Sequence, residues 1–332
     1  IELPIYRREN GLWAHQKWFI RHAFELHKRG GARLILADQV GLGKTVQLAL
    51  AAKLMALEGG GNVLALVPKP LLAQWRDELW NLLRLPSAIW TGQGWEDERE
   101  VFHPAPGPDG LRRCPRRFGL VSTGLIRRSA EARELLSSMT WECVILDEAH
   151  HARRQNLGPS HRNEAPQPNN LLRFLWQIAG SAKSLLLATA TPVQLDPIEA
   201  WDLLHALNLG NWSVLGSRYS RWENRPRTGL DLVLGRESPP TELADVWEWM
   251  RDPLPPADEH RYFKILRDAL RIDDKRHTAS PEALDRLRPS ERDRVSDLAR
   301  VFFKKHHPFI RHIVRRTRSF LEETIDPQTN EP

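Results

Sequence analysis

The chain has 332 residues, of which 41% are apolar and 27% are charged, which is a globular composition long enough for one large core or two modest ones. Its two cysteines, Cys114 and Cys143, exclude a disulfide framework, no Cys/His set has zinc spacing, and no run of about 18 apolar residues could span a membrane. The formal net charge of +6 favours an anionic partner such as nucleic acid.

The first two hundred residues alternate apolar strands with helices. We predict strands at residues 33–37, 63–67, 118–122, 143–146 and 184–188. We predict helices at residues 46–57, 71–83 and 130–137. Apolar strands separated by helices indicate an α/β fold, in which a mostly parallel sheet carries helices on both faces.

Two polar stretches interrupt this alternation. Residues 96–117 are rich in proline, glycine and charge, and residues 153–170 have no apolar period. We expect both to be long, mobile loops or insertions.

The pattern changes at about residue 196 and becomes helical. Helices are predicted at residues 199–207, 241–250, 259–270, 281–287 and 290–303, and residues 231–234 are the one candidate strand. This region is therefore expected to be a helical annex on the α/β core.

A phosphate-binding loop is predicted between the strand at residues 33–37 and the helix that follows it. Gly41 and Gly43 let the backbone approach a phosphate, and the start of the helix adds a positive partial charge. Lys44 would reach the β- and γ-phosphates, and the hydroxyl of Thr45 would bind Mg²⁺. Asp38 occupies the place of the usual first glycine of this loop.

Two carboxylates follow the apolar strand at residues 143–146. The carboxyl end of a parallel strand is where open α/β sheets bind their ligands. Asp147 would hold Mg²⁺, directly or through water, and Glu148 would orient or deprotonate the attacking water. Beyond the strand at residues 184–188, Thr189 and Thr191 could hydrogen-bond this acidic pair; an ordinary cap between strand and helix is the alternative.

These three motifs, in this order, resemble motifs I, II and III of superfamily-two helicases. The Swi/Snf-type group, with its bacterial RapA-like branch, is the nearest likeness, and the resemblance extends from about residue 10 to 320. Further stretches resemble this family at residues 12–16, 66–75, 121–123, 191–194, 199–204 and 309–318. Gln39 departs from the pattern, because the family usually has an acidic residue after Ala-Asp.

The resemblance implies a RecA-like ATP-binding lobe at residues 1–208, a helical insertion at 209–306 and a closing basic segment at 307–332. It implies ATP and Mg²⁺ as cofactors, with Gln16 as the adenine reader and His150 as a coupling residue together with Thr189 and Thr191. Nucleotide contacts would come from Gln16, Asp38, Gly41, Leu42, Gly43, Lys44, Thr45 and Val46.

The resemblance also implies nucleic-acid contacts that position a strand without reading its sequence. They would come from Pro68, Lys69, Gln74, Ser122 and Thr123. Arg315, Arg316 and Arg318 of the closing segment are further candidates, with a solvated face as the alternative.

Three functions remain open at this point. The first is an ATP-driven translocase on double-stranded DNA, the second is a strand-separating DNA or RNA helicase, and the third is an ATP-gated scaffold that does not hydrolyse efficiently. The resemblance also implies a second lobe that carries an arginine finger, and we find no motif of that lobe between Arg318 and Pro332. We therefore expect this chain, as a piece of a longer polypeptide, to bind nucleotide weakly and hydrolyse it slowly by itself.

The biological setting is an expectation of the same kind. The presence of only two cysteines, and a start of the sequence that does not resemble a signal peptide, favour a reduced, intracellular compartment. We expect a prokaryotic, cytoplasmic protein near the nucleoid, or a nuclear one if the source is eukaryotic. A bacterial defence or DNA-transaction system, with antiviral defence or transcription partners, is the expected context.

Overall fold

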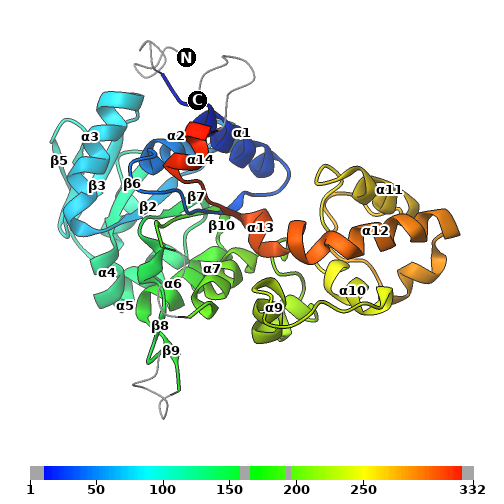
Figure 1. The fold of residues 1–332 in the computed structure, drawn as a ribbon. Coiled ribbons are helices and arrows are strands. Elements are labelled where there is room, and N and C mark those ends of the chain that lie inside the picture. Colours follow the sequence, from blue (N-terminus) through cyan, green and yellow to red (C-terminus); the bar gives the residue numbers. More distant parts are fainter. Residues whose placement is uncertain (1–10, 158–164, 192–195, 324–332) are drawn as a thin grey trace. The chain divides into compact units, whose positions relative to one another are not determined.

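The computed structural model describes residues 11–157, 165–191 and 196–323. Contacts divide the chain into two compact units: unit 1 comprises residues 1–194 and 314–332, and unit 2 comprises residues 195–313 (Figure 1). The predicted boundaries of the ATP-binding lobe at residue 208 and of the helical insertion at residue 306 stay a prediction. Within the described ranges, no helix is long and apolar enough to cross a membrane.

Unit 1 is built around a nine-stranded sheet in the order β11-β1-β10-β7-β2-β6-β3-β4-β5. The strands are β1 (Arg33–Leu36), β2 (Val63–Val67), β3 (Ser87–Trp90), β4 (Gly94–Asp97), β5 (Phe102–Pro104), β6 (Phe118–Ser122), β7 (Trp141–Leu146), β10 (Ala182–Ala188) and β11 (Ile313–Val314). All neighbours from β1 to β3 are parallel, and β4 and β5 add an antiparallel edge. The predicted mostly parallel sheet is confirmed.

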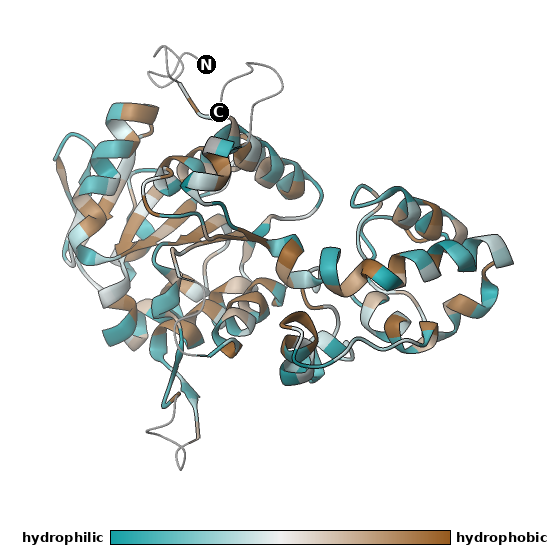
Figure 2. Ribbon diagram, in the orientation of Figure 1, coloured by the Kyte–Doolittle hydropathy of each residue, from teal (hydrophilic) through white to brown (hydrophobic). Residues whose placement is uncertain are grey.

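Helices cover both faces of this sheet (Figure 1). One face carries α1 (Ala14–Lys28), α2 (Lys44–Gly59) and α3 (Leu72–Leu83), and the other carries α4 (Thr123–Arg128), α5 (Ala130–Ser137) and α6 (Asn170–Ala179). The central strands β1, β2 and β7 are apolar along nearly their whole length (Figure 2), because a strand covered on both faces has no solvent side. The predicted α/β class is confirmed.

The first polar stretch, residues 96–117, is not the mobile loop that we predicted. It contains the end of β4, all of β5 and a 3₁₀ helix at Pro108–Arg113. The buried Asp97 carboxylate accepts the N–H groups of Arg99 and Val101 and an Arg116 guanidinium N–H, and it lies 2.9 Å from His103 Nε2. A charged residue satisfied in this way orders a segment that is rich in proline, glycine and charge.

The second polar stretch is partly ordered as well. Two short strands, β8 (Arg154–Gln155) and β9 (Gln167–Pro168), pair antiparallel, and residues 158–164 between them lie outside the described residues. The prediction of a loop through residue 170 also missed the start of α6. Its N-cap residue is Asn169, whose Oδ1 accepts the Leu172 N–H at 2.9 Å.

Unit 2 is helical, as predicted. It contains α7 (Ile198–Asn208), α8 (Arg221–Asn224), α9 (Pro226–Val233), α10 (Leu243–Met250), α11 (Arg261–Leu270), a 3₁₀ helix (Pro281–Arg286), α12 (Pro289–Lys305) and α13 (Pro308–His312). The candidate strand at residues 231–234 was wrong, because this segment lies at the end of α9. Pro226 stands at the first helical turn, where its fixed φ angle favours a helix.

Trp222 lies at the centre of an aromatic cluster in unit 2. Its ring is 1% exposed and contacts Trp249, Phe303 and Phe309, and its indole N–H donates to the Trp249 carbonyl at 2.8 Å. His307 stacks on the same ring, and no described residue accepts or donates at its buried Nδ1. This imidazole is therefore packed as an apolar group.

We expect unit 2 to lose stability in mild acid. Burial lowers the pKa of His277 to about 4, with the Arg267 and Arg311 charges as lesser causes, and burial lowers the pKa of His307 to about 4. As the pH falls, these two histidines take up a proton near pH 6.5 in the unfolded chain. In the folded chain they do so only near pH 4. Stability is therefore complete above pH 6.5 and falls between pH 6.5 and 4, by on the order of 2 kcal/mol for each histidine at pH 5.

Unfolding by urea at pH 7.5, 6 and 5 measures this loss. His307→Phe keeps the aromatic packing and removes one titrating group, so its stability should depend less on pH over this range. An unchanged pH dependence in this variant would contradict the assignment.

Candidate nucleotide site

The predicted phosphate loop lies between β1 and α2, and its strand–loop–helix arrangement is confirmed. Gly41 and Gly43 have φ angles of +89° and +71°, which side chains other than glycine rarely adopt. A Cβ atom on Gly43 would also lie 2.4 Å from Gln16 Nε2. Gly43 is the N-cap of α2 and has no side chain to accept the first N–H groups, which leaves these donors to an anion.

Lys44 lies against the loop that precedes it. Its ammonium donates to the carbonyl of Asp38 at 2.8 Å and to that of Gln39 at 3.4 Å. Thr45 is half-buried beside it, and the side chain of Val46 belongs to the core, so only the backbone of Val46 is free to meet a ligand. A Mg²⁺-bound polyphosphate requires a loop whose glycines leave the backbone N–H groups accessible, together with one ammonium and one hydroxyl group.

The Leu42 carbonyl is the point where three side chains meet the loop. Gln16 Nε2 donates to it at 3.2 Å, Gln47 Nε2 donates at 3.1 Å, and His15 Nε2 lies 3.3 Å away. Gln16 Oε1 accepts the Trp13 N–H at 3.1 Å. Gln16 thus joins the start of α1 to the phosphate loop, and its role as adenine reader stays a prediction.

The acidic pair follows β7, two strands away from β1 in the sheet. Burial, and after it the charge of Glu148, raises the pKa of Asp147, while a hydrogen bond from the Trp75 indole to Asp147 Oδ2 at 3.0 Å opposes the shift. Lys44 is among the charges that act on Asp147. The Asp147 carboxylate, on which the Lys44 charge acts, offers oxygen atoms of the kind that Mg²⁺, a hard cation, takes as ligands.

Glu148 has a φ angle of +50°, which is the left-handed region. A residue other than glycine there costs about 1–2 kcal/mol, so the surroundings must hold it. Its N–H donates to Asp147 Oδ1 at 3.0 Å, and its Oε2 lies 3.1 Å from His150 Nδ1. Such strain clusters at functional sites and agrees with the role predicted for this carboxylate.

His150 and Thr189 connect β7 to its neighbour β10. His150 Nδ1 lies 3.2 Å from Thr189 Oγ1 as well as beside Glu148, and Thr189 Oγ1 accepts the Thr191 N–H at 3.1 Å. The structure therefore brings the three predicted coupling residues together. The continuation of this motif at residues 192–194 lies outside the described residues.

The predicted nucleic-acid residues follow two neighbouring strands, β2 and β6, in which Val67 pairs with Ser122. Lys69 is exposed, and Pro68 is half-buried. Ser122 caps α4 by accepting the Gly124 N–H at 3.0 Å, and Thr123 is only 6% exposed. Among these positions, Lys69 offers the most accessible positive charge.

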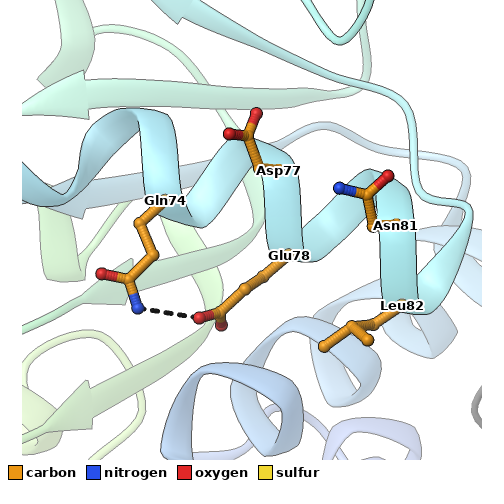
Figure 3. Close-up of a pocket in the computed structure, with 5 residues that line it drawn as sticks. All are labelled: Gln74, Asp77, Glu78, Asn81 and Leu82. Carbon is orange, nitrogen blue, oxygen red and sulfur yellow. Dashed lines mark hydrogen bonds between the residues drawn. The ribbon is translucent and has the colours of Figure 1, made fainter.

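Gln74 lies in acidic surroundings. It lines a surface hollow on α3 with Asp77, Glu78, Asn81 and Leu82, and its amide donates to Glu78 Oε1 at 2.8 Å (Figure 3). Carboxylates beside this amide disfavour an approaching phosphate. Its predicted nucleic-acid contact stays a prediction, and Lys69 is the better position for a test.

One contact of the site was missed by the sequence reasoning. Arg316 was a candidate for nucleic-acid contact, with a solvated face as the alternative, but its side chain is 10% exposed and pairs with the fully buried Asp38 at 2.7 Å. It also donates to the His15 carbonyl at 2.7 Å and to Gln47 Oε1 at 3.0 Å. Neither interpretation of Arg316 was right, because its partner lies 278 positions earlier in the chain.

Comparisons with known proteins agree with the motifs. A model of the SNF2-related domain matches residues 15–330. "RNA polymerase-associated protein RapA" of Klebsiella pneumoniae (strain 342) is 31% identical over 176 residues, which are 52% of this chain and 16% of that protein. The chain thus spans about a sixth of the length of this curated relative.

Two solved structures are also similar to this chain. The "Sulfolobus solfataricus SWI2/SNF2 ATPase core in complex with dsDNA" has a TM-score of 0.48 at 14% identity, over 97% of this chain and 47% of that one. The "Pyrococcus furiosus Hef helicase domain" has a TM-score of 0.41 at 18% identity, over 88% of this chain and 54% of that one.

Proposed function

Because this chain belongs to the SNF2-related domain family, we propose that it is the ATP-binding lobe of an ATP-driven translocase that moves along double-stranded DNA. The observation that carries the proposal is the set of groups at the carboxyl ends of neighbouring strands. The phosphate loop follows β1, the acidic pair follows β7, and His150 connects Glu148 to Thr189 after β10. Ligands of open parallel sheets bind at this edge.

The residues divide the chemistry of ATP hydrolysis between them in this proposal. Backbone N–H groups at Gly43 to Thr45 and the Lys44 ammonium bind phosphate oxygens. Thr45 and Asp147 would hold Mg²⁺, which would offset negative charge on the phosphates. Glu148 orients the attacking water and accepts its proton, and His150 couples this carboxylate to Thr189.

The distribution of charge along the chain supports the proposal that a polyanion binds to unit 1. Unit 2 contains twenty lysines and arginines and twenty aspartates and glutamates, so the whole net charge of +6 arises in unit 1. The exposed Lys69 lies there, on the same sheet edge as the nucleotide site. Phosphate contacts of this kind position a duplex without reading its sequence.

We also propose that the protein acts in a prokaryotic cytoplasm, in DNA transactions or defence.

The choice of nucleic acid distinguishes the proposal from its alternatives. ATP hydrolysis by a duplex translocase is stimulated by double-stranded DNA, and stimulation by single strands or RNA alone would instead favour a strand-separating helicase. Nucleotide-dependent DNA binding without any hydrolysis would favour an ATP-gated scaffold. Single-turnover hydrolysis with the chain in excess over labelled ATP, measured with each nucleic acid in turn, distinguishes the first two functions. Duplex binding measured with and without ATP tests the third.

Lys69→Glu is expected to weaken duplex binding without changing nucleotide affinity. Loss of one phosphate contact should reduce the slope of log affinity against log salt concentration by about 1. Fluorescence anisotropy with a labelled duplex over a range of salt concentrations measures both quantities. Lys264→Glu, a matched change at an exposed lysine of unit 2, is the control. Equal effects of the two variants would contradict a specific contact at Lys69.

A further inference from the structure

The start of the phosphate loop is bound by a segment from the far end of the chain. Asp38 receives three hydrogen bonds from Arg316: its Oδ1 accepts the backbone N–H and the Nε–H at 3.0 Å each, and its Oδ2 accepts an Nη2–H at 2.7 Å. The carboxylate is fully buried. A bidentate arginine fork with an additional backbone N–H is a strong and directional way to hold a carboxylate.

Backbone contacts extend this junction on both sides of Arg316. The Ala37 N–H donates to the Val314 carbonyl at 2.7 Å, and the Gln39 N–H donates to the Arg316 carbonyl at 3.0 Å. Gln39 Oε1 accepts the Arg318 N–H at 2.9 Å. Residues 314–318, which we call the return segment, are therefore bound along residues 37–39.

Arg316 also touches the groups that shape the rest of the loop. Besides Asp38, its guanidinium donates to the His15 carbonyl and to Gln47 Oε1. The side chains of both residues lie at the Leu42 carbonyl, and Gln47 Nε2 lies 3.3 Å from Asp38 Oδ2. The Arg316 guanidinium thus contacts Asp38 at the start of the loop directly. It is connected to the Leu42 carbonyl, further along the loop, through His15 and Gln47.

Arginine suits this place better than lysine. Its planar fork offers five donors in a fixed geometry, and four of its contacts here use that fork. The Arg316 Cζ atom also lies over the Trp18 ring, 5.7 Å from the ring centroid. An ammonium could hold Asp38 but could not reach His15 and Gln47 at the same time.

We infer that Arg316 is a positioning residue of the nucleotide site, which fixes the phosphate loop through Asp38, Gln47 and His15 and joins it to the return segment. The inference rests on the proposed function, because it assumes that the loop binds nucleotide. A loop held in its binding conformation loses less freedom on binding. Docking of the return segment therefore raises nucleotide affinity, and by linkage nucleotide binding strengthens docking by the same factor.

The inference is tested first by affinity, with the 332-residue chain and a fluorescent ADP analogue. Arg316→Gln should weaken binding about tenfold, within the 5–150-fold range of typical couplings, mainly through faster dissociation. Arg316→Lys should give an intermediate affinity. Arg21→Gln, the same change at an exposed arginine of α1, should leave the affinity unchanged.

A double-mutant cycle tests whether the effect passes through Asp38. If it does, Asp38→Asn and Arg316→Gln together should cost less than the sum of the two single changes, because the second change removes a group that has already lost its partner. Additive losses would show that the two residues act independently and would overturn the inference.

Hydrogen exchange provides a readout that a merely structural role would not move. ADP should slow amide exchange in the return segment of the wild-type chain and should have less effect on it in Arg316→Gln. Equal ADP affinity in Arg316→Gln and wild type, or exchange in the return segment that ignores ADP, would overturn the inference.

A comparison with Lys44→Ala separates this outcome from failure of the proposed function. If Lys44→Ala loses nucleotide while Arg316→Gln keeps it, the nucleotide site stands and the role of Arg316 falls. If the wild-type chain binds no nucleotide, the proposed function falls and this inference falls with it.

Discussion

Lys44→Ala is expected to reduce single-turnover ATP hydrolysis by about 10²–10³-fold, the usual cost of removing one donor aimed at developing charge. It should also weaken ATP and ADP binding about 10–100-fold, because hydrogen bonds to charged groups contribute about 1.5–3 kcal/mol each. The ammonium already lies at the loop carbonyls of Asp38 and Gln39 and acts on the Asp147 carboxylate. A polyphosphate would therefore meet a cation held in place.

The same fluorescent-nucleotide titration and single-turnover assay measure both effects. Lys17→Ala, at an exposed position of α1, is the matched control and should behave as wild type. Lys44→Ala should also keep its thermal stability, because the two carbonyls that lose a donor can bind water instead. Retained nucleotide affinity in a folded Lys44→Ala chain would contradict the assignment of the loop.

The order of the central elements could be predicted from the sequence because each depends on a local pattern. The strand–loop–helix around Gly41 and Gly43 needs glycines with positive φ angles directly before a helix, and such a signal is contained in a few adjacent residues. The same holds for Asp147 and Glu148, which follow an apolar strand and so are placed at the edge of the sheet.

Two of the errors share another physical cause, which is that a charged residue shows its partner only in three dimensions. Residues 96–117 were expected to be mobile, yet Asp97 orders them by binding the Arg116 side chain and the N–H groups of Arg99 and Val101. Arg316 was expected to contact nucleic acid or solvent, yet it binds Asp38. In both cases the sequence shows the charge and cannot show which distant group offsets it.

Glu148→Gln is expected to separate nucleotide binding from hydrolysis. Glutamine has nearly the shape of glutamate but cannot accept a proton from water, and loss of general-base catalysis costs about 10²–10⁴-fold in rate. Affinity for ATP should stay within a few-fold of wild type, because the phosphate loop and Asp147 are unchanged. Bound ATP should therefore persist in a pulse-chase measurement long after the wild-type chain has hydrolysed it.

The matched control is Glu131→Gln at an exposed position of α5, which should hydrolyse ATP as wild type does. Asp147→Asn provides a second comparison. This variant should weaken Mg²⁺-dependent binding of ATP, whereas Glu148→Gln should bind ATP normally and lose only hydrolysis. The left-handed backbone at Glu148 makes the expectation sharper, since this residue keeps its conformation at a cost of about 1–2 kcal/mol. If Glu148→Gln hydrolysed ATP at the wild-type rate, that strain would have no link to catalysis, and the base would have to be another group near β7.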